Sequence, residues 1–230
     1  MANAPNCVLQ RGALIVLEGC DRSGKSTQCR FIIEYLTRKG LKVEALEFPE
    51  RTSGTGKLIN QYLTRSQECS DQAIHLLFSS NRWEYAEKMR RKLVDGITLV
   101  IDRYAFSGVA FTAAKKCMSL EWCMSPDRGL PRPDLVVFLD SKPERSAQRA
   151  GFGEERYENI EFQSKVYDVY QKLMTEKGNH WKRVQADQPK EAVSEVVRTL
   201  VDEVLEICAR KPPPPIAQLW VEEETVDQSG

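Results

Sequence analysis

The sequence is poor in histidine and in long apolar segments. Its 230 residues include two histidines, His75 and His180. So few histidines argue against a Ser-His-Asp triad and against a histidine-based metal centre. No apolar run approaches the roughly 18 residues that span a bilayer, and residues 1–10 show neither the basic start nor the apolar stretch of a secretory signal. The 33 Lys and Arg residues balance 33 Asp and Glu residues, without the basic excess typical of nucleic-acid or anionic-membrane binding. We therefore expect no nucleic-acid partner and no membrane partner.

The seven cysteines include no pair with C-x-x-C spacing. An odd number without such pairs fits free thiols in a reducing compartment, so we expect a cytoplasmic location, with the nucleus left open. At about 150 residues per domain the length indicates one domain. We expect an N-terminal extension over 1–10, a folded domain over 11–211, and a Pro-rich linker with an acidic, disordered tail over 212–230.

Strand and helix patterns alternate along the chain. This alternation predicts an α/β fold of the P-loop NTPase type, with a parallel sheet and helices on both of its faces. Short, branched apolar runs indicate strands over 13–17, 43–48, 97–101 and 135–139, with an edge strand over 180–186. Amphipathic patterns and caps predict helices over 25–39, 56–66, 70–95, 158–178 and 190–209.

The sharpest motif is a G-x-x-x-x-G-K-S sequence that runs from Gly19 to Ser26, directly after the first strand. Its glycines let successive backbone N–H groups face a phosphate, and the following helix adds its N-terminal dipole. Lys25 is expected to bridge the β- and γ-phosphates, and the hydroxyl of Ser26 to bind Mg²⁺. The motif predicts binding of a nucleoside triphosphate.

Two carboxylates end strands near this loop. Asp102 and Asp140 follow the third and fourth predicted strands, and either could reach Mg²⁺ through water. Asp102 is followed by Arg103, which puts a cation beside the metal and suits phosphoryl transfer better. We prefer Asp102.

Several residues indicate a second, anionic substrate. Arg51 and Arg103 leave strands at the carboxyl edge of the sheet, where α/β proteins bind ligands, and two guanidinium groups there can hold a phosphate. Phe78 and Arg82 are spaced i, i+4 on one helix face, so a ring and a guanidinium could together contact a planar base. The charged segment 149–158, with two glycines, has the composition of a mobile lid. Together these features favour a nucleotide kinase.

At this point the sequence resembles the thymidylate kinase family, in its eukaryotic form, over about residues 11–220. Five blocks in the order of the family carry the resemblance: Leu17-Glu18-Gly19-x-Asp21-Arg22-x-Gly24-Lys25-Ser26-Thr27, Phe48-Pro49-Glu50-Arg51, His75-Leu76-Leu77-Phe78-Ser79-x-Asn81-Arg82-Trp83-Glu84, Asp102-Arg103-Tyr104-Ala105-Phe106-Ser107-Gly108 and Glu155-Arg156-Tyr157-Glu158. The resemblance implies transfer of the γ-phosphoryl group of ATP to dTMP, with Mg²⁺, by a homodimer. Either helix 70–95 or helix 158–178 would supply the dimer interface.

The resemblance also implies residue roles on the side of the acceptor nucleotide. Arg51 and Arg103 would hold the dTMP phosphate, and Asp21 would bind the 3′-hydroxyl. Tyr104 would lie under the sugar and disfavour a 2′-hydroxyl. The base pocket would be formed by Phe78, stacked on thymine, by Arg82, which donates to a ring oxygen, and by Phe48, Gly108 and Gln163.

On the donor side, the resemblance implies that Arg22 stabilises the transferring γ-phosphoryl group, because in the eukaryotic form the phosphate loop supplies this cation. Lys25 and Arg103 would complete the catalytic set. The ATP-binding set would comprise Gly19, Arg22, Ser23, Gly24, Lys25, Ser26 and Thr27, with Arg149 near the adenine. Glu158 would lie near the hydrated Mg²⁺.

Two other functions remain open from the residues alone. A related kinase could act on another pyrimidine nucleotide or on a deoxynucleoside, although an uncharged acceptor would not need two phosphate-binding arginines. A catalytically silent module that binds nucleotide is the other alternative. It is disfavoured because Lys25, Asp102 and Arg22 are all intact.

Overall fold

A computed structural model describes residues 10–148, 153, 155–175 and 181–221. Its centre is a five-stranded sheet in the order β2-β3-β1-β4-β5, in which every neighbouring pair is parallel. The strands are β1 (Leu14–Glu18), β2 (Val43–Glu47), β3 (Thr98–Asp102), β4 (Leu135–Asp140) and β5 (Trp181–Gln185). The predicted parallel α/β sheet is confirmed, and β5 lies at its edge as expected.

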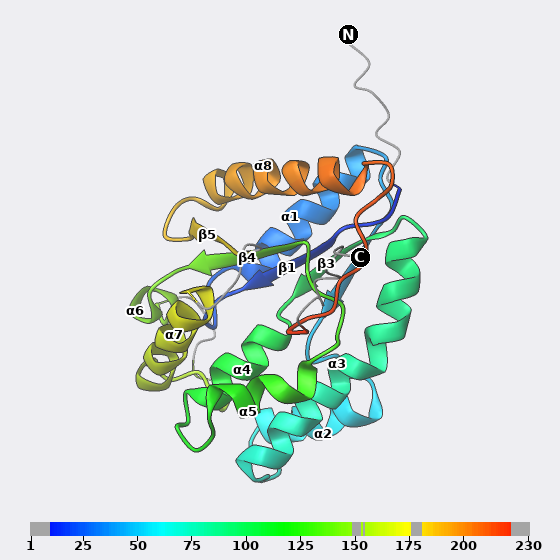
Figure 1. The fold of residues 1–230 in the computed structure, drawn as a ribbon. Coiled ribbons are helices and arrows are strands. Elements are labelled where there is room, and N and C mark those ends of the chain that lie inside the picture. The colour runs from blue at the N-terminus through cyan, green and yellow to red at the C-terminus, as the bar shows by residue number, and fades with distance from the viewer. Residues whose placement is uncertain (1–9, 149–152, 154, 176–180, 222–230) are drawn as a thin grey trace, which may run out of the picture.

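Helices cover both faces of the sheet (Figure 1). Helices α1 (Lys25–Arg38) and α8 (Lys190–Cys208) lie on one face, and α3 (Asp71–Val94), α4 (Ala105–Ala113) and α7 (Ile160–Thr175) lie on the other. Alternate residues of β1 enter the two cores: Leu14 and Val16 pack with α3 and α4, whereas Ile15 and Leu17 pack with α1 and α8. Because both faces are buried, the strands read as continuous apolar runs.

The sequence analysis missed α4, which follows β3 directly. Every residue from Ala105 to Ala110 is buried. A helix that is buried all round has no polar face, so the 3.6-residue periodicity that identifies surface helices is lost. The described residues also form α2 (Gly54–Leu63) and three shorter elements: α5 (Leu120–Met124), the 3-10 turn η1 (Ser125–Asp127) and α6 (Pro143–Ser146).

The segment after α8 corrects an expectation. Residues 212–221 were expected to begin a Pro-rich linker outside the folded domain, but they return along the molecule and pack against it (Figure 1). Leu219 is buried and exchanges backbone hydrogen bonds with Gly129 and Leu130 at 3.0 and 2.8 Å. The ring of Trp220 packs edge-on against Phe106. Prolines favour extended backbone, and here the extended chain carries apolar side chains that the core accepts. Residues 222–230, which hold the acidic tail, lie outside the described residues.

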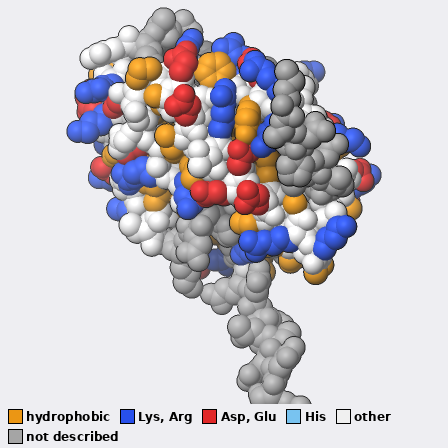
Figure 2. Space-filling view, turned by 90° about the horizontal axis from the view of Figure 1, so that it is seen from above, with side chains coloured by type: hydrophobic (Ala, Val, Ile, Leu, Met, Phe, Trp, Pro, Cys, Tyr) orange, Lys and Arg blue, Asp and Glu red, His pale blue; other side chains and the backbone are white. Residues whose placement is uncertain are grey.

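The face over α1 and α8 carries charges of both signs. Figure 2 shows Lys and Arg side chains interspersed with Asp and Glu side chains and with scattered hydrophobic ones. Among the described residues, no helix is long and apolar enough to cross a membrane.

Candidate active site

The phosphate loop lies between β1 and α1, where the sequence places it. Gly19 and Gly24 have positive φ values of 145° and 103°, and a Cβ atom on Gly19 would come within 2.8 Å of the carbonyl oxygen of Leu139. A side chain at position 19 would therefore strain the loop. Helix α1 begins at Lys25, so its first N–H groups and its dipole are available to an anion held by the loop.

Lys25 lies inside this loop and is 5% exposed. Its ammonium group donates to the carbonyl oxygens of Cys20 at 2.7 Å and Gly19 at 3.2 Å. Burial, followed by the nearby charge of Arg103, lowers the pKa of Lys25 to about 8. A phosphate bound beside this buried ammonium group would favour its charged form and raise its pKa back towards the ordinary value.

Asp102 and Asp140 end β3 and β4, the strands on either side of β1, but have different surroundings. Asp102 accepts a hydrogen bond from the hydroxyl of Ser26 at 2.6 Å, and its other oxygen is buried without a hydrogen-bond partner among the described residues. Asp140 accepts from Tyr167, Arg183 and Gln185 at 2.9, 3.1 and 3.2 Å. Asp140 is thus bound by three neighbouring side chains, whereas Asp102 has an oxygen available to coordinate a cation next to Ser26.

These contacts fit a hard divalent cation that is held only in part by the protein. Within the described ranges, no group of three or more His, Cys, Asp or Glu side chains could hold a metal ion. Mg²⁺ typically takes one or two protein ligands and completes its shell with phosphate oxygens and water. Ser26 and Asp102 match that donor set.

One cavity adjoins the phosphate loop and collects the residues predicted for the acceptor. It encloses about 700 Å³ of space, part of it open to solvent, which lies in the range of small-molecule sites. Eight of the nine predicted acceptor residues line it: Asp21, Phe48, Arg51, Phe78, Arg82, Arg103, Tyr104 and Gly108. The ninth, Gln163, donates to the carboxylate of Asp21 at 2.6 Å from just outside.

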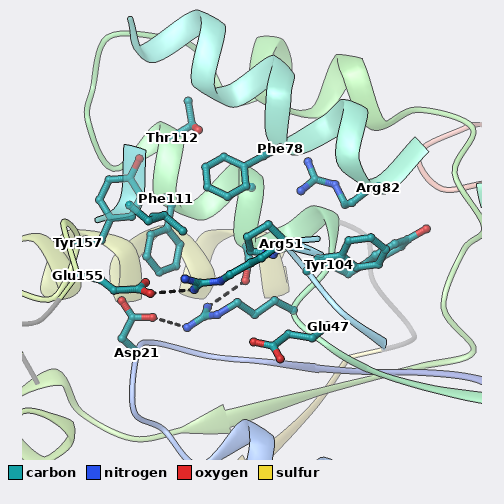
Figure 3. A pocket seen from close by; sticks show the side chains of 16 residues that line it. Asp21, Glu47, Arg51, Phe78, Arg82, Tyr104, Phe111, Thr112, Glu155 and Tyr157 are labelled. Carbon is teal, nitrogen blue, oxygen red and sulfur yellow. Dashed lines mark hydrogen bonds and ion pairs between the residues drawn. The ribbon is translucent and has the colours of Figure 1, made fainter. Parts of the chain in front are cut away.

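The end of the cavity next to the phosphate loop is basic. Arg51 and Arg103 both line this end, and Figure 3 shows Arg51 beside Glu155, with Asp21 close by. Arg103 forms an ion pair with Asp21, and Arg51 forms one with Glu155 at 2.8 Å. Because both carboxylates are partly exposed, an entering phosphate could replace them on the guanidinium groups.

The far end of the cavity is suited to a planar ring. Phe78 and Arg82 point into it from α3 (Figure 3). Arg82 is buried and donates to both oxygens of Asp127, at 3.1 and 2.6 Å, which fixes its guanidinium group. A Cβ atom on Gly108 would lie 2.8 Å from Arg82, so a larger residue there would displace the arginine. The hydroxyl of Tyr104 donates to the carbonyl oxygen of Pro131 at 3.2 Å.

The lid residues that the structure describes contact the phosphate loop. Glu158 accepts from the guanidinium of Arg22 at 2.9 Å and from the backbone N–H groups of Gly153 and Glu155 at 3.0 and 3.2 Å. Burial alone would raise the pKa of Glu158, but these donors hold it below its usual value. Arg149, predicted to lie near the adenine, falls outside the described residues.

The sequence analysis missed several residues of the cavity. Ser107, Phe111 and Thr112 line it from α4, the helix whose pattern was not recognised. Glu47, at the end of β2, also lines it, and burial raises the pKa of its carboxyl group, with Asp102 adding to the effect.

A second hollow lies beside α6 and the 186–189 turn. The residues that line it were not predicted to form a site: Arg145, Gln148, Ala186, Asp187, Gln188 and Pro189.

Comparison with known proteins gives consistent matches. A family model described as thymidylate kinase matches residues 17–197. The chain is 48% identical to human thymidylate kinase over 211 residues, which covers 92% of this chain and 98% of the human one. It is 54% identical to thymidylate kinase of Schizosaccharomyces pombe over 166 residues, or 72% and 79% of the two chains.

A solved structure of thymidylate kinase from Candida albicans has the same fold. It superposes with a TM-score of 0.79 at 36% identity and covers 87% of this chain and 94% of that chain.

Proposed function

We propose roles for the residues of this site from one premise: the chain belongs to the thymidylate kinase family and transfers the γ-phosphoryl group of ATP to dTMP, giving ADP and dTDP. The observation that carries the proposal is the cavity beside the phosphate loop. It is basic where it meets the loop, and it holds an aromatic ring and a fixed guanidinium group at its far end. This polarity matches a nucleoside monophosphate, with its phosphate towards the donor and its base away from it.

On the acceptor side, Arg51 and Arg103 exchange their carboxylate partners for the dTMP phosphate, and the released Asp21 accepts from the 3′-hydroxyl of the deoxyribose. Phe78 stacks on thymine, while Arg82, held by Asp127, donates to a ring oxygen. The remaining pocket residues close around the sugar and base: Phe48, Tyr104, Gly108 and Gln163.

On the donor side, the loop from Gly19 to Thr27, with Ser23 and Gly24 in its turn, cradles the β- and γ-phosphates of ATP. The role of Arg149 at the adenine is proposed from the family resemblance, because this residue lies outside the described ones. Ser26, Asp102 and, through water, Glu158 would hold Mg²⁺, which would supply positive charge to the phosphate oxygens.

The chemistry needs little from a general base, because the acceptor is already an anion and phosphoryl transfer has a loose transition state. The side chains instead align the two anions and neutralise their charge. Lys25, Arg22 and Arg103 surround the point where the two substrates meet. Closure of the predicted lid, 149–158, would exclude water, which would otherwise compete with dTMP as the acceptor.

The substrate assignment is tested by measuring ADP release from Mg·ATP with dTMP, dUMP, UMP, dCMP, AMP and GMP. We expect a strong preference for dTMP and weaker activity with dUMP. UMP should be poorer than dUMP, because Tyr104 leaves little room for a 2′-hydroxyl. Better activity on a purine monophosphate would overturn the roles of Phe78, Arg82 and Tyr104. Bound ATP without turnover of any acceptor would favour a silent module.

We also propose that the chain is a homodimer that associates through α3. Leu76 and Trp83 are spaced i, i+7 on α3 and are 48% and 41% exposed, and Leu58 on the neighbouring α2 is 45% exposed. Residues spaced i, i+7 lie on one helix face, so Leu76 and Trp83 form an exposed apolar face of α3, and such a face is typical of a subunit interface. On α7, the other helix considered, Ile160 is the large hydrophobic side chain that is similarly exposed among the described residues.

The Leu76→Glu variant is expected to halve the mass measured by sedimentation. The control is Val196→Glu, because Val196 is equally exposed, at 47%, but lies on α8, away from α3. An unchanged mass for Leu76→Glu, or a monomeric wild type, would contradict the interface.

A further inference from the structure

Glu18 is a buried carboxylate that the proposed mechanism does not use. It is the last residue of β1 and is 0% exposed. One of its oxygens accepts from the backbone N–H groups of Tyr104 and Ser107, at 2.9 and 3.1 Å. The other accepts from the hydroxyls of Ser107 and Tyr170, at 2.6 and 2.8 Å. A buried ion with four donors is fully satisfied, which offsets the free energy of its desolvation.

Two of these donors belong to the beginning of α4. A helix leaves its first N–H groups without intrahelical partners, and a side chain at the N-cap often accepts from them. Tyr104 is the N-cap of α4 and provides no such side-chain hydrogen bond. Glu18, from a distant part of the sequence, takes that place, and its negative charge also suits the helix dipole. Strand β1 thus holds the start of α4.

The third donor connects Glu18 to Arg103. The hydroxyl of Ser107 accepts from the guanidinium of Arg103 at 3.2 Å. A hydroxyl has one proton, and the short 2.6 Å contact directs it to Glu18. The resulting chain runs from Arg103 through Ser107 to Glu18. Arg103 also has a φ of 66°, an uncommon value for a residue with a side chain, so its surroundings must hold it there.

Arg103 therefore has two different carboxylate partners. Asp21 binds it directly and is partly exposed, so a substrate phosphate can replace it. Glu18 acts through Ser107 and is inaccessible to substrate. When the phosphate takes the place of Asp21, the side of the guanidinium that faces Ser107 remains held.

We propose that Glu18 is a positioning residue, which orients Arg103 towards the acceptor phosphate through the hydroxyl of Ser107. The proposal rests on the proposed role of Arg103 in binding that phosphate. Tyr170 provides a matched control, because its hydroxyl contacts both Glu18 and Ser107, at 2.8 and 2.9 Å, and the structure gives it no hydrogen bond to Arg103. Burial, with the charge of Glu18 second, raises the pKa of Tyr170 far above its usual range, so it stays a donor.

The experiment compares Ser107→Ala with Tyr170→Phe, each of which removes one hydroxyl donor from Glu18. We expect Ser107→Ala to raise KM for dTMP by about tenfold, as expected for a lost hydrogen bond to a charged group, with KM for ATP within twofold. Both variants should lower Tm to a similar extent, because each removes one hydrogen bond to Glu18. Tyr170→Phe should nevertheless leave KM for dTMP within twofold of wild type. Equal effects of the two variants on KM, or no effect of Ser107→Ala, would overturn the proposal.

A double-mutant cycle separates positioning from a direct contact between Ser107 and dTMP. In an Arg103→Ala background, Ser107→Ala should have no further effect on KM for dTMP, because the group that it positions is absent. A further tenfold increase in KM would show a direct contact and overturn the proposal.

The single variants of this cycle also test the phosphate-binding role of Arg103 and the positioning role of Glu18 separately. If Arg103→Ala alone is silent, the proposed phosphate-binding role fails; if it is strongly impaired while Ser107→Ala is silent, only the positioning role of Glu18 fails.

Discussion

Replacing Arg22 with alanine is expected to lower kcat by about 10³-fold or more, while the affinity for ATP changes by only a few-fold. Cations that meet the transferring phosphoryl group are worth roughly 10³–10⁵ in rate in other phosphoryl-transfer enzymes. Arg22 lies within the phosphate loop at a φ of 60°, and its guanidinium pairs with Glu158 of the lid region at 2.9 Å. It therefore lies between the donor phosphates and the element that closes over them. Pre-steady-state phosphoryl transfer and equilibrium binding of ATP measure the two quantities separately.

The control for this variant is Arg30→Ala. Arg30 lies on α1, eight residues further along the chain, and its side chain is exposed. Removing it changes the net charge equally without touching the loop, so kcat should stay within twofold. A loss of only a few-fold in Arg22→Ala, at unchanged ATP affinity, would show that Arg22 does not stabilise the transferring group. A large loss of ATP affinity would instead make it a ground-state binding residue.

The parts of the site that could be predicted from the sequence are those with local patterns. The phosphate loop is one contiguous motif, and its strand-turn-helix context was visible in residues 13–39. Asp102 ends β3, Arg103 follows it, and Arg51 lies just beyond β2, after Phe48-Pro49-Glu50. Parallel strands bring their carboxyl ends to one edge. Topology alone therefore predicts that these side chains meet.

The parts that could not be predicted depend on contacts between distant residues. Asp127 fixes Arg82 from 45 positions away, and in the sequence it stands in a Pro-Asp pair that is typical of a turn. Ser107, Phe111 and Thr112 were missed because α4 is buried and carries no amphipathic pattern. The segment 212–221 was misjudged because proline content reports backbone conformation, whereas packing depends on side chains such as Leu219.

The second large effect is expected for Asp102→Asn, which should lower kcat by about 100-fold and raise the Mg²⁺ concentration needed for half-maximal activity by about 10- to 100-fold. Asparagine keeps the shape and can still accept from Ser26, but it removes the negative charge that favours a divalent cation. When the remaining oxygen accepts from Ser26, the second position, which in Asp102 is a buried oxygen with no partner in the described part of the chain, becomes an NH₂ group that cannot bind a cation. Initial rates over a Mg²⁺ titration at fixed ATP and dTMP give both values.

Asp140→Asn is the matched control, because Asp140 ends β4 as Asp102 ends β3, and both are nearly buried. The carboxylate of Asp140 is already bound by Tyr167, Arg183 and Gln185, so its substitution should lower Tm while the Mg²⁺ dependence stays within twofold of wild type. If Asp140→Asn shifted the Mg²⁺ titration and Asp102→Asn did not, the two carboxylates would have opposite roles. That result would also mean that the hydrogen-bond partners of Asp102 and Asp140 do not indicate which of the two carboxylates can bind the cation.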